Sequence, residues 1–355
     1  MGSPVKRVFR LGLWIDPAFE QRLSREPGVA LSGCPVEAPE GEFVAGVSSA
    51  HVYQVGSAKD ENPRHAFVTG ALLAKCPQLL CVSTYGAGYD TVDVPACTQA
   101  GVIVVNQAGG NAQSVAEHTL AFALSVSRRV GESDRILRRE RGFSREDLMG
   151  REIAGKVIGL VGIGHVGTKV ARLALAFGME VLAVDPYLTE EEIARRGAKA
   201  VTLDKLLARA DFVSLHCPRD KATMGMMDAK AFARMKPGSI FISTARGGIH
   251  DEAALLQALQ SGHLAGAGLD VWDEEPPPLD HPLLALDTVV ASSHTAGVTH
   301  EARRNVAAMG AEQIAGVLKG GRPPRLVNPE AWPAYAARFE KLLGLPVAGG
   351  DGSPD

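Results

Sequence analysis

A G-x-G-x-x-G motif lies near the middle of this 355-residue chain, at residues 162–167, and it constrains the fold more than any other feature. The apolar run 157–161 precedes the motif, and apolar residues at helical spacing follow it. A second apolar run, 181–184, then ends at Asp185. This order predicts a strand, a tight glycine turn, a helix and a second strand with an acidic residue at its end. Such an arrangement is typical of a dinucleotide-binding βαβ unit.

Each part of the motif has a physical role in such a unit. Gly162 allows the tight turn, Gly164 lets the backbone approach a pyrophosphate, and Gly167 lets the helix pack closely on the strand. The helix N-terminus offers free N–H groups and the positive end of its dipole to the phosphates. Asp185 would accept hydrogen bonds from the adenosine ribose and repel a 2′-phosphate, which predicts NAD rather than NADP.

The length and composition are those of a globular protein with two domains. Hydrophobic residues make up 46% of the chain and charged residues 22%, and the net charge of −3 gives no reason to expect nucleic acid or an anionic membrane as a partner. The five cysteines are scattered without a C-x-x-C pair, so neither a metal site nor a disulfide framework is expected. The N-terminus lacks a signal-peptide layout and no apolar run is long enough for a membrane helix, so we expect a cytoplasmic protein.

Short apolar runs alternate with helical patterns on both sides of the motif. Before it, we predict strands at 8–14, 50–55, 79–83 and 102–105, and helices at 17–25, 64–76 and 94–100. From the motif onward, we predict strands at 157–161, 180–184, 212–216, 239–243, 265–269 and 289–291, and a long helix at 299–319. The alternation predicts mostly parallel sheets with helices on both faces, which is an α/β doubly wound architecture.

Three other segments have their own signals. Ser114 to Glu117 has the capping-box form S-x-x-E, which predicts a helix that begins at Ser114 and ends near Arg129. The charged segment 132–151 is predicted to be a solvated helix and arm, and residues 349–355 a disordered tail.

Three polar residues follow predicted strands downstream of the motif, namely Arg246, Glu275 and His294. Ligands of open parallel sheets bind beyond the carboxyl ends of the strands. A guanidinium, a carboxylate and an imidazole there, beside a nicotinamide, would suit hydride transfer at a carbonyl. Each residue also has an ordinary alternative: a surface ion pair for Arg246, an acidic loop for Glu275, and a structural hydrogen bond for His294.

Taken together, several segments resemble the D-isomer-specific 2-hydroxyacid dehydrogenases of the phosphoglycerate dehydrogenase-like type. They occur in the family's order between about residues 45 and 330: 86–90, 111–118, the motif with Asp185, 216–218, 244–247, 268–276, 293–297 and 327–329. The resemblance implies two doubly wound lobes, with a Rossmann NAD-binding domain (113–298) inserted into a flavodoxin-like substrate-binding domain (1–112 and 299–332). Residues 333–355 would form a C-terminal extension whose end is disordered.

The resemblance also implies roles for the catalytic residues. Arg246 would bind the substrate carboxylate and polarise the C2 oxygen, and His294 would exchange the proton on that oxygen. Glu275 would fix the tautomer of His294 and raise its pKa. Backbone N–H groups near Ala87 and Gly88 would anchor the substrate carboxylate, although a plain strand-to-helix turn is the alternative there.

The remaining implied residues belong to the cofactor site. They would surround the pyrophosphate, the adenosine and the nicotinamide of NAD: Gly162, Gly164, His165, Val166, Gly167, Asp185, Pro186, Cys217, Pro218, Thr223, Thr244, Ala245, Asp270 and Gly297.

The predicted activity is the NAD-dependent interconversion of a D-2-hydroxy acid and its 2-oxo acid by a homodimer. Two alternatives remain at this point: a formate- or phosphite-type dehydrogenase on the same scaffold, and a dinucleotide-sensing binding protein of the corepressor kind. Residues 56–59 replace the Arg-x-Arg that phosphoglycerate-type members often have, which disfavours a phosphorylated substrate, although Lys59 or Arg64 could serve. His250 stands where the family often has Val. We expect it at the surface, at the start of a helix, and an extra imidazole near the site is the alternative.

Overall fold

A computed structural model describes residues 5–12 and 15–348 of the chain. The chain divides into two compact units, one made of Met1–Asn111 with Thr299–Asp355 and the other of Ala112–Val298. The end of the first predicted strand, at residues 13–14, and the predicted tail at 349–355 lie outside the described residues.

The first unit contains a parallel sheet of five strands, in the order β2-β1-β3-β4-β5. Its strands are β1 (Lys6–Leu11), β2 (Val29–Cys34), β3 (Val52–Val55), β4 (Cys81–Thr84) and β5 (Ile103–Val105). This is the flavodoxin-like order, which confirms the fold expected for this part of the chain. The strands β3, β4 and β5 are buried along their whole length because helices cover both faces of the sheet.

Two apolar clusters flank this sheet. The helices of the first unit are α1 (Ala18–Leu23), α2 (Glu40–Val47), η1 (Arg64–Ala66), α3 (Gly70–Lys75), α4 (Val94–Gln99), α12 (His300–Val317), η4 (Pro329–Ala331) and α13 (Trp332–Leu343). On one face α2, α3 and α4 pack around Phe43, Leu72 and Cys97, and on the other α1, α12 and α13 pack around Phe19 and Tyr335. Residues 333–343 of the predicted extension therefore belong to α13, which packs into this core.

The second unit contains a parallel sheet of seven strands, in the order β12-β11-β10-β9-β6-β7-β8. Its strands are β6 (Val157–Val161), β7 (Glu180–Val184), β8 (Lys199–Ala200), β9 (Phe212–Leu215), β10 (Ser239–Ser243), β11 (Leu264–Leu269) and β12 (Val289–Ala291). The order reverses between β6 and β9, so this is a Rossmann sheet with its topological switch point beside the glycine motif. The predicted class, two doubly wound α/β lobes, is confirmed.

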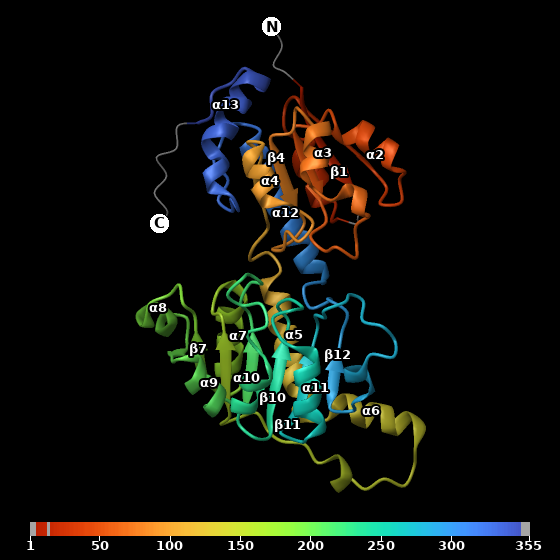
Figure 1. Ribbon diagram of the computed structural model, residues 1–355, viewed down its shortest axis with the longest axis vertical. Helices are drawn as coiled ribbons and strands as arrows, with labels where there is room; N and C mark the ends of the chain where they lie inside the picture. Colours follow the sequence, from red (N-terminus) through yellow and green to blue (C-terminus); the bar gives the residue numbers. More distant parts are fainter. Residues whose placement is uncertain (1–4, 13–14, 349–355) are drawn as a thin grey trace. The chain divides into compact units, whose positions relative to one another are not determined.

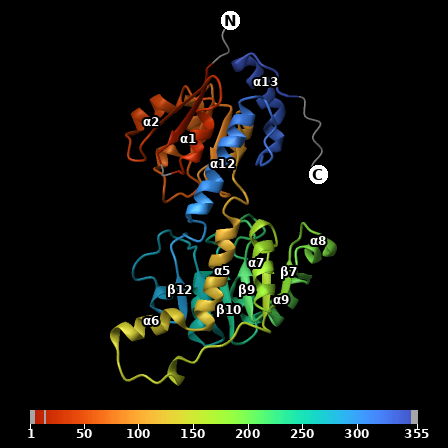
Figure 2. The ribbon, with the colours of Figure 1, turned by 180° about the vertical axis from the view of Figure 1, so that it is seen from behind.

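Helices cover both faces of the second sheet. They are α5 (Ala112–Ser127), α6 (Val130–Arg139), η2 (Glu146–Leu148), α7 (His165–Ala176), α8 (Glu190–Arg195), α9 (Leu203–Arg209), α10 (Ala229–Arg234), α11 (Glu252–Gln260) and η3 (Pro282–Ala285). Figure 1 shows α10 and α11 in front of the sheet. Figure 2, seen from behind, shows α5 and α7 in front of it. Helix α6 has no buried residue, which confirms the predicted solvated helix and arm.

Several expected boundaries were wrong, and local chemistry explains them. Helix α5 begins at Ala112, so Ser114 lies inside its first turn and does not cap it. The helix predicted at 64–76 is divided in two, because Thr69 caps α3 by accepting a hydrogen bond from the N–H of Leu72. The prediction omitted β2, which contains Ser32 and Gly33, α2, which contains Gly41 and Gly46, and the two-residue strand β8.

Candidate active site

The glycine motif forms a turn into which a dinucleotide pyrophosphate fits. Gly162 has a φ of +91°, and a Cβ atom added there would lie 2.8 Å from the backbone nitrogen of Cys217. A Cβ at Gly167 would lie 2.4 Å from the carbonyl oxygen of Gly162, so turn and helix pack without room for a side chain. At Gly164 an added Cβ would meet nothing within 4 Å, which leaves the space that a ligand needs.

Helix α7 begins directly behind this turn. Its N-cap is Gly164, and no side chain caps it, so the first N–H groups, including those of His165 and Val166, are left for an anion. His165 is exposed and Val166 half-buried. The residues present therefore fit a dinucleotide.

Asp185 lies at the end of β7, next to the turn. Its Oδ2 accepts a hydrogen bond from the N–H of Ile163 at 3.0 Å, and its Oδ1 accepts one from the N–H of Tyr187 at 3.1 Å. The carboxylate is thus held by two backbone donors and is half-buried. A carboxylate oxygen has more than one lone pair, so each can also accept a hydrogen bond from a ribose hydroxyl.

The residues expected around the adenine lie on the loop after β9 and just beyond β7. Cys217 is half-buried against the core, and burial raises the pKa of its thiol to about 11, so it is a packing residue rather than a nucleophile. The hydroxyl of Thr223 donates to the carbonyl oxygen of Pro218 at 2.7 Å and shapes this loop. Pro186 is exposed after Asp185.

Adjacent strands bring the three predicted catalytic residues to one edge of the second sheet. Arg246 follows β10, Glu275 follows β11 and His294 follows β12, and these three strands are neighbours in the sheet. Because all of them are parallel, their carboxyl ends meet at the same edge. The guanidinium, carboxylate and imidazole are all partly buried there.

Glu275 and His294 form a hydrogen-bonded ion pair. The Nδ1 of His294 lies 2.8 Å from Oε2 of Glu275, and this contact raises the pKa of the imidazole above its ordinary value, against the opposing effect of burial. Burial would raise the pKa of Glu275, but the hydrogen bond from His294, the charges of His294 and Arg246, and the N–H of Trp272 together lower it. Nδ1 therefore carries the proton and donates it in the hydrogen bond to Glu275, and Nε2 is the ring nitrogen available to a ligand.

The loop that presents His294 is held by Asp270. The backbone of His294 is left-handed, with φ +51°, and its N–H donates to the carbonyl oxygen of Asp270 at 2.7 Å. The buried Asp270 carboxylate accepts from the N–H groups of Thr295 and Ala296 and from the hydroxyl of Ser292. Sequence reasoning assigned Asp270 to the nicotinamide; the structure gives its carboxylate these three partners in the loop.

Three other predicted residues lie beside this edge. Thr244 and Ala245 are buried at the end of β10, and the Thr244 hydroxyl lies 3.2 Å from that of Thr119 on α5. Gly297 follows the Asp270-bound loop and is half-buried. The Nη1 of Arg246 donates to the carbonyl oxygen of Ala245 at 2.7 Å, which orients the guanidinium at the edge of the sheet.

In the first unit, Ala87 and Gly88 lie in the loop that follows β4. Ser57 accepts a hydrogen bond from the N–H of Gly86 at 2.8 Å, and Asn106 donates to the carbonyl oxygen of Ala87 at 2.8 Å. Within the described part of the chain, no group accepts a hydrogen bond from the N–H groups of Ala87 or Gly88. Sequence reasoning missed Ser57 and Asn106 as the residues that shape this loop, since neither belongs to a glycine pattern.

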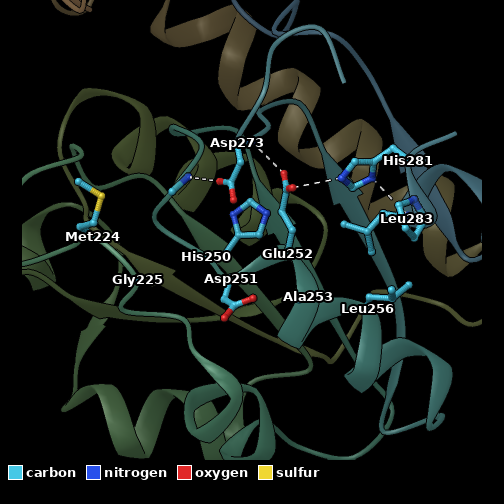
Figure 3. Close-up of a pocket in the computed structure, with 12 residues that line it drawn as sticks. Met224, Gly225, His250, Asp251, Glu252, Ala253, Leu256, Asp273, His281 and Leu283 are labelled. Atoms are coloured by element: carbon cyan, nitrogen blue, oxygen red, sulfur yellow. Dashed lines mark hydrogen bonds and ion pairs between the residues drawn. The ribbon is translucent and has the colours of Figure 1, made fainter. Parts of the chain in front are cut away.

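A pocket of about 600 Å³ lies on the α11 side of the second unit, and Figure 3 shows the side chains around it. His250 lines it, and with 1% exposure it is buried, so the predicted surface position is wrong. The ring packs against Phe241, and burial lowers the pKa of this imidazole to about 4. Glu252 and Asp273 on its wall belong to α11 and to the loop that precedes Glu275.

The same loops hold a second His–Glu pair, in which Nε2 of His281 lies 3.1 Å from Oε2 of Glu252. In the described ranges, no three His, Cys, Asp or Glu side chains are grouped to hold a metal ion. All five cysteines are free thiols. A search of the described helices finds none with the length and apolar content that a bilayer span requires.

Comparisons with known proteins show the family and the fold that this chain resembles. Residues 120–296 match the family described as D-isomer specific 2-hydroxyacid dehydrogenase, NAD binding domain. The chain is 39% identical over 257 residues to a glyoxylate reductase of Korarchaeum cryptofilum, an alignment that covers 72% of this chain and 77% of the relative. The fold matches that of D-lactate dehydrogenase from Aquifex aeolicus complexed with NAD and lactic acid, with a TM-score of 0.75 and 27% identity over 88% of this chain and 96% of that one.

A D-3-phosphoglycerate dehydrogenase of Archaeoglobus fulgidus is 42% identical over 253 residues, or 71% of this chain. The alignment covers 48% of that relative, so the chain spans about half the length of such phosphoglycerate dehydrogenases. The second unit contains the family's NAD-binding domain. From these matches, together with the glycine turn and the two parallel sheets, we conclude that the chain belongs to the D-isomer-specific 2-hydroxyacid dehydrogenase family.

Proposed function

We propose that this protein is an NAD-dependent dehydrogenase that interconverts a D-2-hydroxy acid and its 2-oxo acid. The observation that supports it most is the pair formed by His294 and Glu275, beside Arg246 at the carboxyl edge of the sheet. An imidazole whose pKa is raised by a carboxylate can act as an acid in reduction and as a base in oxidation near neutral pH.

Each residue of the site has one task in this reaction. NAD, when bound, would accept or supply the hydride at C2 of the substrate. Arg246 would bind the substrate carboxylate and polarise the C2 oxygen, because a planar guanidinium makes paired, charge-assisted hydrogen bonds. His294 would give a proton to the C2 oxygen in reduction and take it back in oxidation, through Nε2. Glu275 would keep the proton on Nδ1 and stabilise the imidazolium.

The first unit would supply the second anchor for the substrate carboxylate. The N–H groups of Ala87 and Gly88 are the donors proposed for it, and Asn106 and Ser57 would hold their loop in place. We place substrate binding in this unit and cofactor binding in the second. The substrate class proposed is an unphosphorylated 2-oxo acid, since residues 56–59 lack the paired arginines expected for a phosphate.

Asp185 supports a preference for NAD over NADP. Its carboxylate is tied to the glycine turn and would repel a 2′-phosphate at the adenosine ribose. The five cysteines are free thiols, as is usual in a reducing compartment, and we propose a cytoplasmic location.

We also propose a homodimer. The arm that begins with α6 has no buried residue in that helix, and it exposes Val130, Leu137, Phe143 and Met149. Exposed apolar side chains on an extended arm are suited to burial against a second copy. A molar mass near twice that of one chain in solution is expected, and a monomer at micromolar concentration would contradict it.

The main test is NADH oxidation with a panel of 2-oxo acids: glyoxylate, hydroxypyruvate, pyruvate, phenylpyruvate and phosphohydroxypyruvate. Steady turnover with at least one acid and formation of its D-2-hydroxy product are expected. Tight NADH binding without turnover of any acid would contradict the proposal and indicate a dinucleotide sensor. Turnover of formate or phosphite in place of these acids would indicate the other alternative on this scaffold.

A further inference from the structure

Arg196 directly follows helix α8 and reaches the glycine turn of the cofactor site. Its Nη1 donates a hydrogen bond to the carbonyl oxygen of Ile163 at 2.7 Å, between the first and second glycines of the motif. Asp185 accepts a hydrogen bond from the N–H of the same residue at 3.0 Å. The backbone of Ile163 is therefore hydrogen-bonded at its carbonyl oxygen by the guanidinium of Arg196 and at its N–H by the carboxylate of Asp185.

This shared partner limits the distance between the two charges. The N and O atoms of one residue are separated by three bonds, so the guanidinium and the carboxylate lie no more than about 10 Å apart. Screening by physiological salt sets in over about 8 Å, and both groups are half-buried, where screening is weaker. A ligand group placed beside Asp185 would therefore experience both charges.

The guanidinium of Arg196 also has N–H donors that the bond to Ile163 does not use. A guanidinium has five N–H donors, and the bond to Ile163 uses one of them. Among the described residues, no carboxylate lies within ion-pair distance of Arg196 and no second acceptor binds it. The acidic neighbour Glu192, four residues earlier, is tied to the N–H of Thr189 at 2.7 Å in the capping box of α8.

We propose that Arg196 is a specificity residue of the cofactor site, whose guanidinium supplies the positive charge that a 2′-phosphate on the adenosine ribose would need. The negative charge of Asp185 opposes this positive charge at the position of the 2′-phosphate. The NAD preference therefore depends on one carboxylate rather than on the lack of a cation. In Rossmann sites an Arg near the ribose can accommodate the 2′-phosphate. This inference rests on the cofactor role proposed for the second unit and adds the residue that would make NADP acceptable.

Direct binding of NADH and NADPH, followed by nucleotide fluorescence, tests the inference without any substrate. Asp185→Ser should tighten NADPH binding roughly tenfold or more, because a phosphate can then form charge-assisted hydrogen bonds with Arg196. Adding Arg196→Gln to Asp185→Ser should remove that gain. Adding Arg195→Gln instead is the matched control, since Arg195 is exposed one residue earlier and should leave the gain intact.

Two further measurements separate a charge effect from a structural one. Arg196→Lys in the Asp185→Ser background keeps the charge and should retain part of the NADPH gain, whereas Gln should retain none. The gain should also shrink as salt concentration rises. Thermal unfolding of each variant serves as the control that the protein is folded.

The outcomes that overturn the inference differ from those that overturn the proposed function. If Asp185→Ser with Arg196→Gln binds NADPH as tightly as Asp185→Ser alone, Arg196 has no part in specificity. If Arg196→Gln weakens NADH and NADPH equally in both backgrounds, the residue only holds the turn. If the wild-type protein binds neither nucleotide, both proposals fail.

Discussion

The loops after the strands of the two sheets differ in what they present, although both sheets are parallel and covered by helices on both faces. In the first unit, the loop after β4 presents backbone N–H groups at Ala87 and Gly88. In the second unit, the loops after β10, β11 and β12 present side chains, those of Arg246, Glu275 and His294.

The difference follows from the chemistry that each edge is proposed to perform. Anchoring a carboxylate needs only donors at fixed positions, and backbone N–H groups provide them without titrating. Moving a proton needs a group whose pKa lies near the working pH and is set by its neighbours. Side-chain substitutions near the loop after β4 are therefore expected to reduce activity less than substitutions in the loops after β10, β11 and β12. Four predictions, in order of expected effect, test this contrast.

The largest effect is expected from His294→Asn. Asn tolerates the left-handed backbone at this position, so the loop should keep its shape while the acid–base group is lost. Turnover should fall by about 10²–10⁴-fold with NADH binding unchanged. His281→Asn, at the other His–Glu pair of this unit, is the control and should keep near-normal turnover. Equal losses in the two variants would contradict the role of His294.

The next effect is expected from Arg246→Lys. Lys keeps the charge but not the planar pair of donors, so kcat/KM for the 2-oxo acid should fall by about 10²–10³-fold. The control is Arg234→Lys, an exposed residue paired with Asp204 in the same unit. Wild-type kinetics in Arg246→Lys would show that a charge alone suffices at this position.

Glu275→Gln should change the pH dependence of the reaction. Glu275 raises the pKa of His294, so the imidazolium that reduction needs persists to higher pH in the wild type. Without the carboxylate the pKa of His294 should fall, and the alkaline limb of the kcat/KM profile for reduction should move to lower pH. On that limb, we expect the rate to drop roughly tenfold for each pH unit by which the limb moves. An unchanged alkaline limb would contradict the assignment.

The smallest effect is expected in the first unit, from Asn106→Ala. It removes the hydrogen bond to the carbonyl oxygen of Ala87, which is 2.8 Å long, and a typical net loss of this kind corresponds to about a 2- to 10-fold rise in KM for the 2-oxo acid. Binding of NADH should stay the same. Asn305→Ala, which removes a 3.4 Å contact to Gly110 in this unit, is the control. A loss as large as that of Arg246→Lys would remove the contrast between the two edges.

Much of the fold could be predicted from local patterns, and the omissions have a common cause. The strands β6, β7, β10 and β12 have the predicted bounds because buried parallel strands are apolar runs with sharp ends. The edge strand β2 was missed because Ser32 and Gly33 interrupt its apolar run, and helix α2 because Gly41 and Gly46 weaken its helical pattern. Packing against the rest of the unit decides the structure of both elements. Ser114 showed how a capping pattern can lie inside a helix.

The site shows the same division. The glycine motif and the residues after the strands could be found in the sequence, since the turn and the strand ends are local features. The sequence could not show the partners of Asp270, the burial of His250 or the hydrogen bond from Arg196 to Ile163. Each of these depends on residues that are distant in the chain. Such contacts carry no periodic signal.

By itself, the sequence determined the bounds of strands β6, β7, β10 and β12, the glycine turn and the types of charged group available after these strands, because these depend on neighbours along the chain. Only the tertiary structure decided that β10, β11 and β12 are adjacent, and hence that Glu275 lies 2.8 Å from His294. The pKa of His294 is raised by that contact, and a pKa depends on charges and burial in space rather than on position in the sequence.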